Sequence, residues 1–180
     1  MRGWITALLC AGALASQTAH AIVGCWISEA GTSVIEIIAI DGVASGRVVG
    51  LEEPHFVEGE AQGTPGEVRT DLNNPDAALR AQPVAGITIV SDLVRGQARK
   101  DGEWVDGRIY DPEAGRSYAA TGTLNRDGSL GLRGYIGSPM FGRTTKWTPA
   151  AARPEDAQRM LARTAPLLPD GVPETDCALR

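Results

Sequence analysis

The chain has 180 residues, with 17 Lys and Arg against 22 Asp and Glu, which gives a formal net charge of −5. This length indicates one domain, and the apolar content argues against a chain that is disordered throughout. A mildly acidic protein lacks the basic face that phosphate backbones require, so we expect no nucleic-acid partner. Glycine contributes 22 residues, an excess that favours tight turns and strand bends over long helices.

Residues 1–21 have the pattern of a secretory signal peptide. Arg2 gives a short positive start, an apolar stretch follows from Trp4 to about Ala15, and residues 19–21 form an Ala-His-Ala cleavage site. The apolar stretch is shorter than the roughly 20 residues that a membrane span needs, and an N-terminal anchor is the alternative. We therefore expect cleavage after Ala21 and a periplasmic or secreted protein that does not span the membrane after cleavage.

Cleavage there would leave two cysteines, Cys25 and Cys177. In an exported protein such a pair favours a disulfide, which here would link the two ends of the domain; two unpaired thiols are the alternative. The same cleavage leaves His55 as the one histidine. One histidine and a disulfide are too few ligands for a transition-metal site, so we expect no metal and no cofactor.

Eight short segments have the alternation and the β-branched content of strands. Turn signals such as Asp41 and Gly42 join them into hairpins. Closing eight strands into a barrel removes the exposed edges of an open sheet. We predict an all-β fold, an eight-stranded antiparallel up-and-down barrel, with an open meander or sandwich as the alternative. The predicted strands are residues 22–28, 33–40, 46–51, 87–93, 103–110, 116–124, 129–136 and 142–148.

The segments outside the strands are a loop, a short helix and a tail. Residues 52–74 are polar and predict a flexible loop or lid. Asn74 and Pro75 predict a short helix before the fourth strand, with structural roles as its N-cap and first residue. A second helix is predicted at residues 154–164. The predicted division is a signal peptide at 1–21, a barrel at 22–148, and a C-terminal helix with a Pro-rich tail at 149–180.

A wider pattern of residues resembles a known family. Gly24 and Trp26, with Cys25 between them, resemble the Gly-x-Trp signature of lipocalin and calycin barrels. The whole pattern is similar to a bacterial exported family known as domain of unknown function 2147, over residues 23–148. This resemblance implies a small calycin-like barrel in the cell envelope, without an established activity. The pattern comprises Asp71, Asn74, Pro75, Arg80, Gly86, residues 107–112, Gly115, Tyr118, residues 132–135, Gly142, Arg143 and Trp147.

The resemblance also implies structural roles for Gly24 and Trp26. In calycin barrels this tryptophan plugs the base of the barrel, commonly beneath an arginine from a late strand. Arg143 or Arg133 would take that position in this chain, and spacing does not choose between them.

No group of residues favours catalysis, and we name no catalytic residue. A nucleophilic triad needs a base, and His55 lies alone in the polar loop. Residues 71–76 are rich in oxygen ligands that could bind calcium, but helix capping explains them more simply. Glu36 interrupts an apolar strand, and we expect it on the solvent face, with a pocket acid as the alternative.

Arginine and aromatic residues on the predicted strands form a candidate ligand-binding set. Alternation places Trp104, Arg108 and Tyr110 on one face of their strand. If such faces point inward, apolar walls with cationic donors would suit an amphipathic acid; if outward, leucines fill a sealed core. The candidate binding residues are Arg108, Tyr110, Tyr118, Arg133, Tyr135 and Trp147.

Three functions remain in order of preference. The first is a non-enzymatic exported barrel that binds a small hydrophobic or amphipathic ligand. The second is an envelope protein-interaction or accessory module with a filled core, whose partner the sequence does not identify. The third is an enzyme whose catalytic residues the sequence does not identify.

Overall fold

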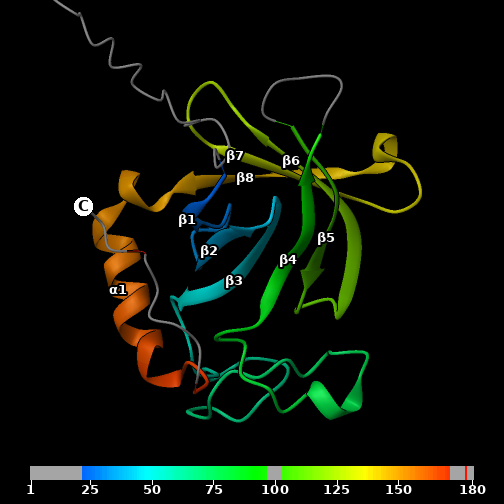
Figure 1. The fold of residues 1–180 in the computed structure, drawn as a ribbon. Coiled ribbons are helices and arrows are strands. Elements are labelled where there is room, and N and C mark those ends of the chain that lie inside the picture. The colour runs from blue at the N-terminus through cyan, green and yellow to red at the C-terminus, as the bar shows by residue number, and fades with distance from the viewer. Residues whose placement is uncertain (1–21, 97–102, 171–176, 178–180) are drawn as a thin grey trace, which may run out of the picture.

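In the computed structural model, which describes residues 22–96, 103–170 and 177, eight antiparallel strands form a closed barrel (Figure 1). Each strand pairs with the next one in the chain, and β1 pairs with β8. The predicted up-and-down barrel is therefore confirmed, while the predicted signal peptide lies outside the described residues. The strands are β1 (Gly24–Ile27), β2 (Ser33–Ile40), β3 (Val43–Leu51), β4 (Thr88–Arg95), β5 (Glu103–Asp111), β6 (Arg116–Leu124), β7 (Leu130–Tyr135) and β8 (Arg143–Pro149).

The barrel interior is filled by large apolar side chains. Trp26, Trp104 and Trp147 are 5%, 2% and 4% exposed and belong to one buried cluster. The inner face of β2 adds Ile35 and Ile37 to the same cluster. Three tryptophans therefore occupy space that a ligand inside the barrel would need.

A β-bulge decides which side chains of β5 face this interior. Asp106 has a φ of 60°, and the register between β5 and β6 shifts between Trp104 and Gly107. Because a bulge breaks the alternation of side chains, Trp104 faces the core whereas Arg108 and Tyr110 lie on the outer face. The prediction that these three residues share one face is wrong for this reason.

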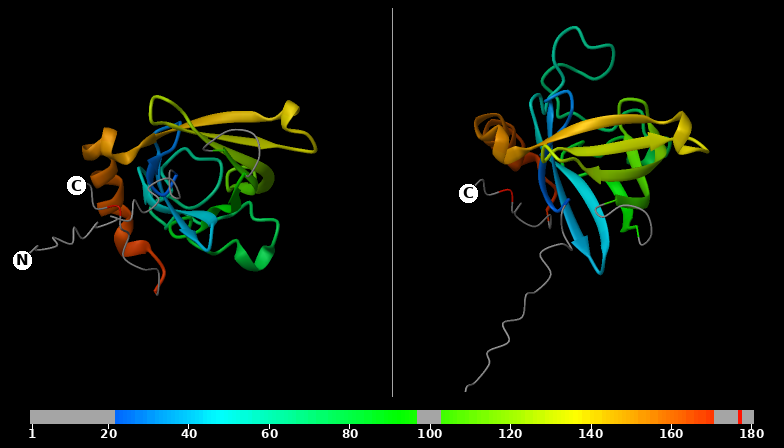
Figure 2. Two further views of the ribbon diagram at one scale, coloured as in Figure 1. Left: turned by 45° about the horizontal axis from the view of Figure 1, so that its top comes forward. Right: turned by 90° about the horizontal axis from the view of Figure 1, so that it is seen from above.

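Helix α1 (Pro154–Thr164) lies against the outside of β2 and β3, as predicted for residues 154–164 (Figures 1 and 2). Its buried residues Ala157, Met160 and Thr164 fall on one face of the helix. The Thr164 hydroxyl accepts a hydrogen bond from the N–H of Leu51 at 2.8 Å, which fixes the helix against the end of β3.

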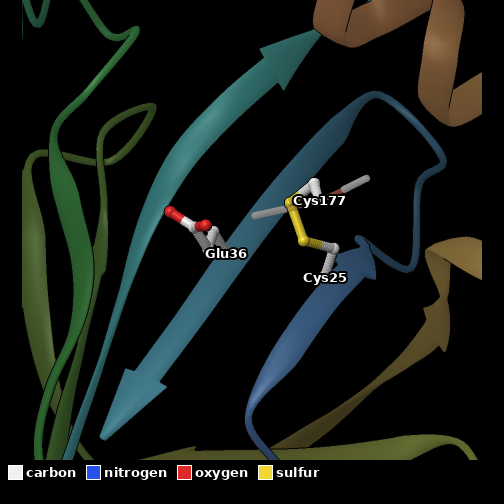
Figure 3. A group of neighbouring side chains, drawn as sticks. All are labelled: Cys25, Glu36 and Cys177. Atoms are coloured by element: carbon white, nitrogen blue, oxygen red, sulfur yellow. A yellow bond between two sulfur atoms is a disulfide. The ribbon is translucent and has the colours of Figure 1, made fainter. Parts of the chain in front are cut away.

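A disulfide between Cys25 and Cys177 ties the segment after α1 back to β1, as predicted (Figure 3). The two cysteines are 152 residues apart, and the chain-entropy model assigns such a span roughly 5 kcal/mol. Gly24, just before Cys25, has a φ of 137°, which supports its structural role. The solvent-face prediction for Glu36 is wrong: it is 3% exposed, beside the disulfide, and forms an ion pair with Arg47 at 2.6 Å.

The segment between β3 and β4 folds across one end of the barrel (Figure 1). Val84 and Ile87 of this segment pack with Val48 of β3 in a second buried cluster. Arg69 stabilises the outer part, since its guanidinium forms an ion pair with Glu60 at 2.7 Å and lies over the Phe56 ring. The predicted flexible loop is thus a segment with its own hydrogen bonds and packing.

The predicted helix before β4 is a single 3₁₀ turn, η1 (Ala77–Leu79), and its N-cap is Asp76 rather than Asn74. The Asn74 side chain is engaged elsewhere, because it accepts from the Asp76 N–H and donates to Asp71. Pro75 lies before this N-cap, so it is not the first residue of the helix as predicted. None of the helices in the described part of the chain has the length and apolar character needed to cross a bilayer. The other 3₁₀ turns are η2 (Pro139–Phe141), η3 (Ala150–Ala152) and η4 (Ala165–Leu167).

Candidate functional site

A cleft of about 500 Å³ lies on the outside of the barrel, between the β4–β5 wall and the segment that precedes β4. The register identifies this side as the outer one. Ile109 pairs with Val90, which is buried in the core, so the neighbouring Arg108 and Tyr110 point the opposite way. The cleft is lined by Asp71, Asn74, Pro75, Leu79, Gln82, Ile87, Thr88, Ile89, Ser91, Arg108, Tyr110 and Ser117.

A hydrogen-bonded carboxylate closes one side of this cleft. Asp71 is 3% exposed and accepts hydrogen bonds from the Tyr110 hydroxyl at 2.8 Å and the Asn74 amide at 2.7 Å. Burial, together with the hydrogen bond to Asp71, raises the pKa of Tyr110 to about 12. The phenol therefore keeps its proton at neutral pH and links two segments that are 39 residues apart.

Three further contacts hold the same segment in place. The Asn73 amide donates to the carbonyl oxygen of Glu113 at 2.8 Å, in the turn between β5 and β6. Gly115 lies so close to Asn73 that an added Cβ would overlap the Asn73 carbonyl group, and its φ is 62°. Arg80 donates to the carbonyl oxygen of Asn74 at 2.8 Å. The cleft wall is thus a fixed part of the fold.

Arg108 is the cation of the cleft. Among the described residues, its guanidinium has no hydrogen-bond or ion-pair partner. Ser91 is its cross-strand neighbour on β4, and the Ser91 hydroxyl donates to the Asp92 carboxylate at 2.8 Å. Ser117 is the neighbour of Tyr110 on β6 and also lines the cleft. Leu79 and Ile89 add apolar surface. This combination is suited to a carboxylate attached to an apolar body.

The other predicted binding residues do not join this cleft. Tyr118 lies on the inner face of β6, and Trp147 is buried in the core. Arg133 and Tyr135 lie on the outer face of β7, where Arg133 donates to the carbonyl oxygen of Pro139 at 2.7 Å. Of the six predicted binding residues, the structure places Arg108 and Tyr110 in the cleft and the other four outside it.

Trp26 is structural, but no arginine covers it in the way predicted. Its indole N–H donates to the carbonyl oxygen of Ile22 at 2.8 Å. Arg143 instead has an 83% exposed side chain and an ion pair with Glu29 at 3.1 Å, and Arg133 lies on the outer face of β7. The prediction for Arg143 and Arg133 is wrong because the chain before β1 supplies the polar partner of the indole.

A second cluster contains Cys25, Glu36 and Cys177, whose potential ligand atoms lie within 4.8 Å of one another (Figure 3). Metal ions bind the thiolate form of cysteine, whereas these two sulfur atoms are bonded to each other. Glu36 is also paired with Arg47. This cluster is therefore a covalent link with a buried ion pair beside it.

Sequence reasoning missed Asp71 as a site residue, because an Asp-rich turn is explained well by capping. Asp71, Asn74, Pro75, Arg108 and Tyr110 all belong to the wider residue pattern quoted above, and all five line the cleft. Membership in this pattern is the sequence signal that could have identified Asp71 as a site residue. Spacing alone does not reveal that the five meet on the outside of the barrel.

A family model described as an uncharacterized protein conserved in bacteria (DUF2147) matches residues 24–149. No curated protein sequence matches the chain. Among solved structures, the chain is similar to protein HP1028 from the human pathogen Helicobacter pylori, which is described as belonging to the lipocalin family. The two chains are 18% identical, with a TM-score of 0.57, and the match covers 79% of this chain and 96% of the other. At this identity, the likeness supports a lipocalin-like barrel fold.

Proposed function

We propose that this protein, which belongs to the DUF2147 family of bacterial proteins, is a non-enzymatic binding protein for a small amphipathic acid. The ligand would lie in the cleft on the outside of β4 and β5. Its carboxylate would contact Arg108, and its apolar part would lie against Leu79, Ile87 and Ile89.

The observation that carries this proposal is the guanidinium of Arg108, which is without a partner among the described residues although it lines a cleft. Three arginines elsewhere in the chain give a contrast, whereas Arg116 and Arg126 are exposed and do not line the cleft. Arg69 and Arg133 donate to protein oxygens at 2.7 Å, and Arg159 forms two ion pairs. An arginine that remains uncommitted beside apolar surface is suited to bidentate binding of a ligand carboxylate.

The size of the cleft supports a small ligand. Small-molecule sites usually occupy about 300–1,000 Å³, and this cleft of about 500 Å³ lies within that range. The barrel interior supports the outer location, because Trp26, Trp104 and Trp147 fill it.

A non-enzymatic role is supported by the state of the polar groups in the cleft. Asp71 is 3% exposed and accepts hydrogen bonds from Tyr110 and Asn74, so it is engaged in holding the cleft wall together. Tyr110, with its pKa raised to about 12, is a poor proton donor or acceptor at neutral pH. Both groups therefore serve the shape of the cleft.

The proposal places the protein in the periplasm or outside the cell. The signal-peptide pattern of residues 1–21 motivates this location. The disulfide between Cys25 and Cys177 supports it, because disulfides persist in oxidising compartments.

The test uses two fluorescent probes, a dansyl-labelled undecanoic acid and the matching alcohol, with the full protein as a cell exports it. We expect saturable binding of the acid. Arg108→Gln is expected to weaken it about tenfold or more, because a charge-assisted hydrogen bond contributes about 1.5–3 kcal/mol. The same substitution is expected to leave binding of the alcohol nearly unchanged.

Arg116→Gln is the matched control, because Arg116 is an exposed arginine of β6 that does not line the cleft. Loss of binding in this control, or equal binding of the acid by Arg108→Gln, would overturn the assignment of Arg108. Absence of saturable binding would overturn the binding function itself.

A protein-interaction or accessory module is the second candidate, and the filled interior favours it. A barrel whose core is closed by three tryptophans needs no ligand to complete its packing. Absence of probe binding, together with a protein that co-purifies in defined proportion, would support this candidate instead.

A further inference from the structure

The hairpin of β7 and β8 projects beyond the barrel as an arm (Figures 1 and 2). In the register of β8 with β1, the paired residues of β8 are Thr148 and Pro149. Residues 143–147 of β8 are therefore paired with β7 on one side, without β1 on the other. We define the tip of this arm as residues 135–142, which include η2.

The tip presents apolar side chains to solvent. Ile136, Met140 and Phe141 are 71%, 80% and 81% exposed, which are the highest values for large hydrophobic residues in the part of the chain that the structure describes. Residues 135–142 contain no charged side chain. Soluble proteins rarely expose large apolar groups together, so an apolar group at the end of a projection marks a contact surface.

Hydrogen bonds hold the tip in a defined shape. Arg133 donates through Nε to the carbonyl oxygen of Pro139 at 2.7 Å and through Nη1 to the hydroxyl of Thr144 at 3.0 Å. The Ser138 hydroxyl accepts from the N–H of Met140 at 3.3 Å. These hydrogen bonds thus fix the turn that carries the exposed apolar side chains.

The arm is also the basic part of an acidic protein. Residues 124–148 contain the four basic residues Arg126, Arg133, Arg143 and Lys146, and one acidic residue, Asp127. The rest of the chain has 13 basic and 21 acidic residues. The two ion pairs of the arm, Arg143 with Glu29 and Lys146 with Asp127, are exposed to solvent, so they leave these cations available to an anionic surface.

We propose that the tip of the arm inserts into the interfacial region of a bilayer that contains anionic lipids. Segments that bind such surfaces bury apolar side chains at the acyl boundary and keep arginine or lysine at the level of the phosphates. The arm has the same arrangement of apolar side chains followed by cations, because Arg133 and Arg143 are the first charged residues on either side of the tip. This contact does not depend on the cleft.

The dimensions of the tip favour a membrane over a protein partner. A protein interface of standard size engages about 20–30 residues on each side, whereas the tip has eight. A few apolar side chains with nearby cations suffice for reversible binding to a membrane surface, since apolar burial and electrostatic attraction add.

The test measures binding of the exported protein to vesicles, with phosphatidylglycerol mixed into phosphatidylcholine or with phosphatidylcholine alone. We expect binding to the anionic vesicles that is at least tenfold tighter and that weakens in about 1 M NaCl. Replacing Met140 and Phe141 together by serine is expected to lower this binding at least tenfold. Ile40→Ser is the matched control, because Ile40 is 67% exposed at the opposite hairpin of β2 and β3.

A second measurement places the tip itself in the bilayer. Phe141→Trp adds an exposed tryptophan to a barrel whose Trp26, Trp104 and Trp147 are buried. Lipids brominated in the acyl chain are expected to quench this variant on binding and to leave the wild-type fluorescence nearly unchanged. Equal binding by the double serine variant, no binding to anionic vesicles, or an oligomer that the double variant abolishes would each overturn the proposal.

Discussion

The two faces of the β4–β5 wall differ in the side chains that they carry. On the inner face, Trp104 and Val90 pack in an apolar cluster that leaves them 2% and 0% exposed. On the outer face, Arg108 is without a partner among the described residues, beside a buried carboxylate that Tyr110 holds. The same strands thus pack the apolar core on one side and carry the polar groups of the proposed site on the other. In a lipocalin-like barrel whose interior is filled, the outer face of the wall is where we place the proposed site.

Truncating the inner face is expected to have the largest effect. Trp104→Ala removes a side chain that is 2% exposed, and such losses cost about 3–5 kcal/mol through lost burial and the cavity left behind. Urea denaturation would measure this as a fall in the free energy of unfolding. If the inner and outer faces are independent, the folded fraction still binds the acidic probe with nearly wild-type affinity. A smaller stability loss with impaired probe binding would place the ligand inside the barrel.

An intermediate effect is expected on the outer face. Tyr110→Phe removes the hydroxyl that donates to Asp71, and an under-satisfied buried polar group costs about 1–3 kcal/mol. Tyr118→Phe is the matched control, since Tyr118 lies on the inner face of β6. Urea denaturation of both variants checks the comparison. Equal stability losses in the two would show that the bond to Asp71 contributes nothing specific.

The smallest effect concerns pH. The folded pKa of Tyr110 is raised from 10.0 to about 12 by burial and by Asp71. A raised pKa means that this contribution to stability is complete below pH 10 and is lost as the pH rises through about 12. Absorbance of tyrosinate during alkaline titration would follow it, and Tyr110→Phe should remove the component near pH 12. A component that persists in this variant would belong to another tyrosine.

Strand positions were predictable because they depend on local pattern. The bounds of β2 and β6 agree with the predictions for residues 33–40 and 116–124, which are rich in β-branched residues or bounded by clear turns. β3 begins earlier than predicted, since Asp41 and Gly42 both have positive φ and make a two-residue hairpin turn.

The faces of the strands and the cleft were less predictable. The bulge at Asp106 reverses which side Arg108 occupies, and a left-handed Asp in a strand has no reliable local signal. The cleft depends on Asp71 meeting Tyr110 from 39 residues away. Such a contact arises from how the segment before β4 folds across the barrel, which neither periodicity nor composition encodes locally.

The seam between β1 and β8 has a consequence for the order in which the barrel assembles. The register of this pairing contains two residue pairs, Trp26 with Pro149 and Ile27 with Thr148. The other pairings join strands that follow one another in the chain, and all of them except β3 with β4 form across short connections at low cost in loop-closure entropy. We therefore expect the chain to pass through a curved, still open sheet. Its free edges would meet last, when residues more than a hundred positions apart come together, and the Cys25–Cys177 bond then holds the closed state.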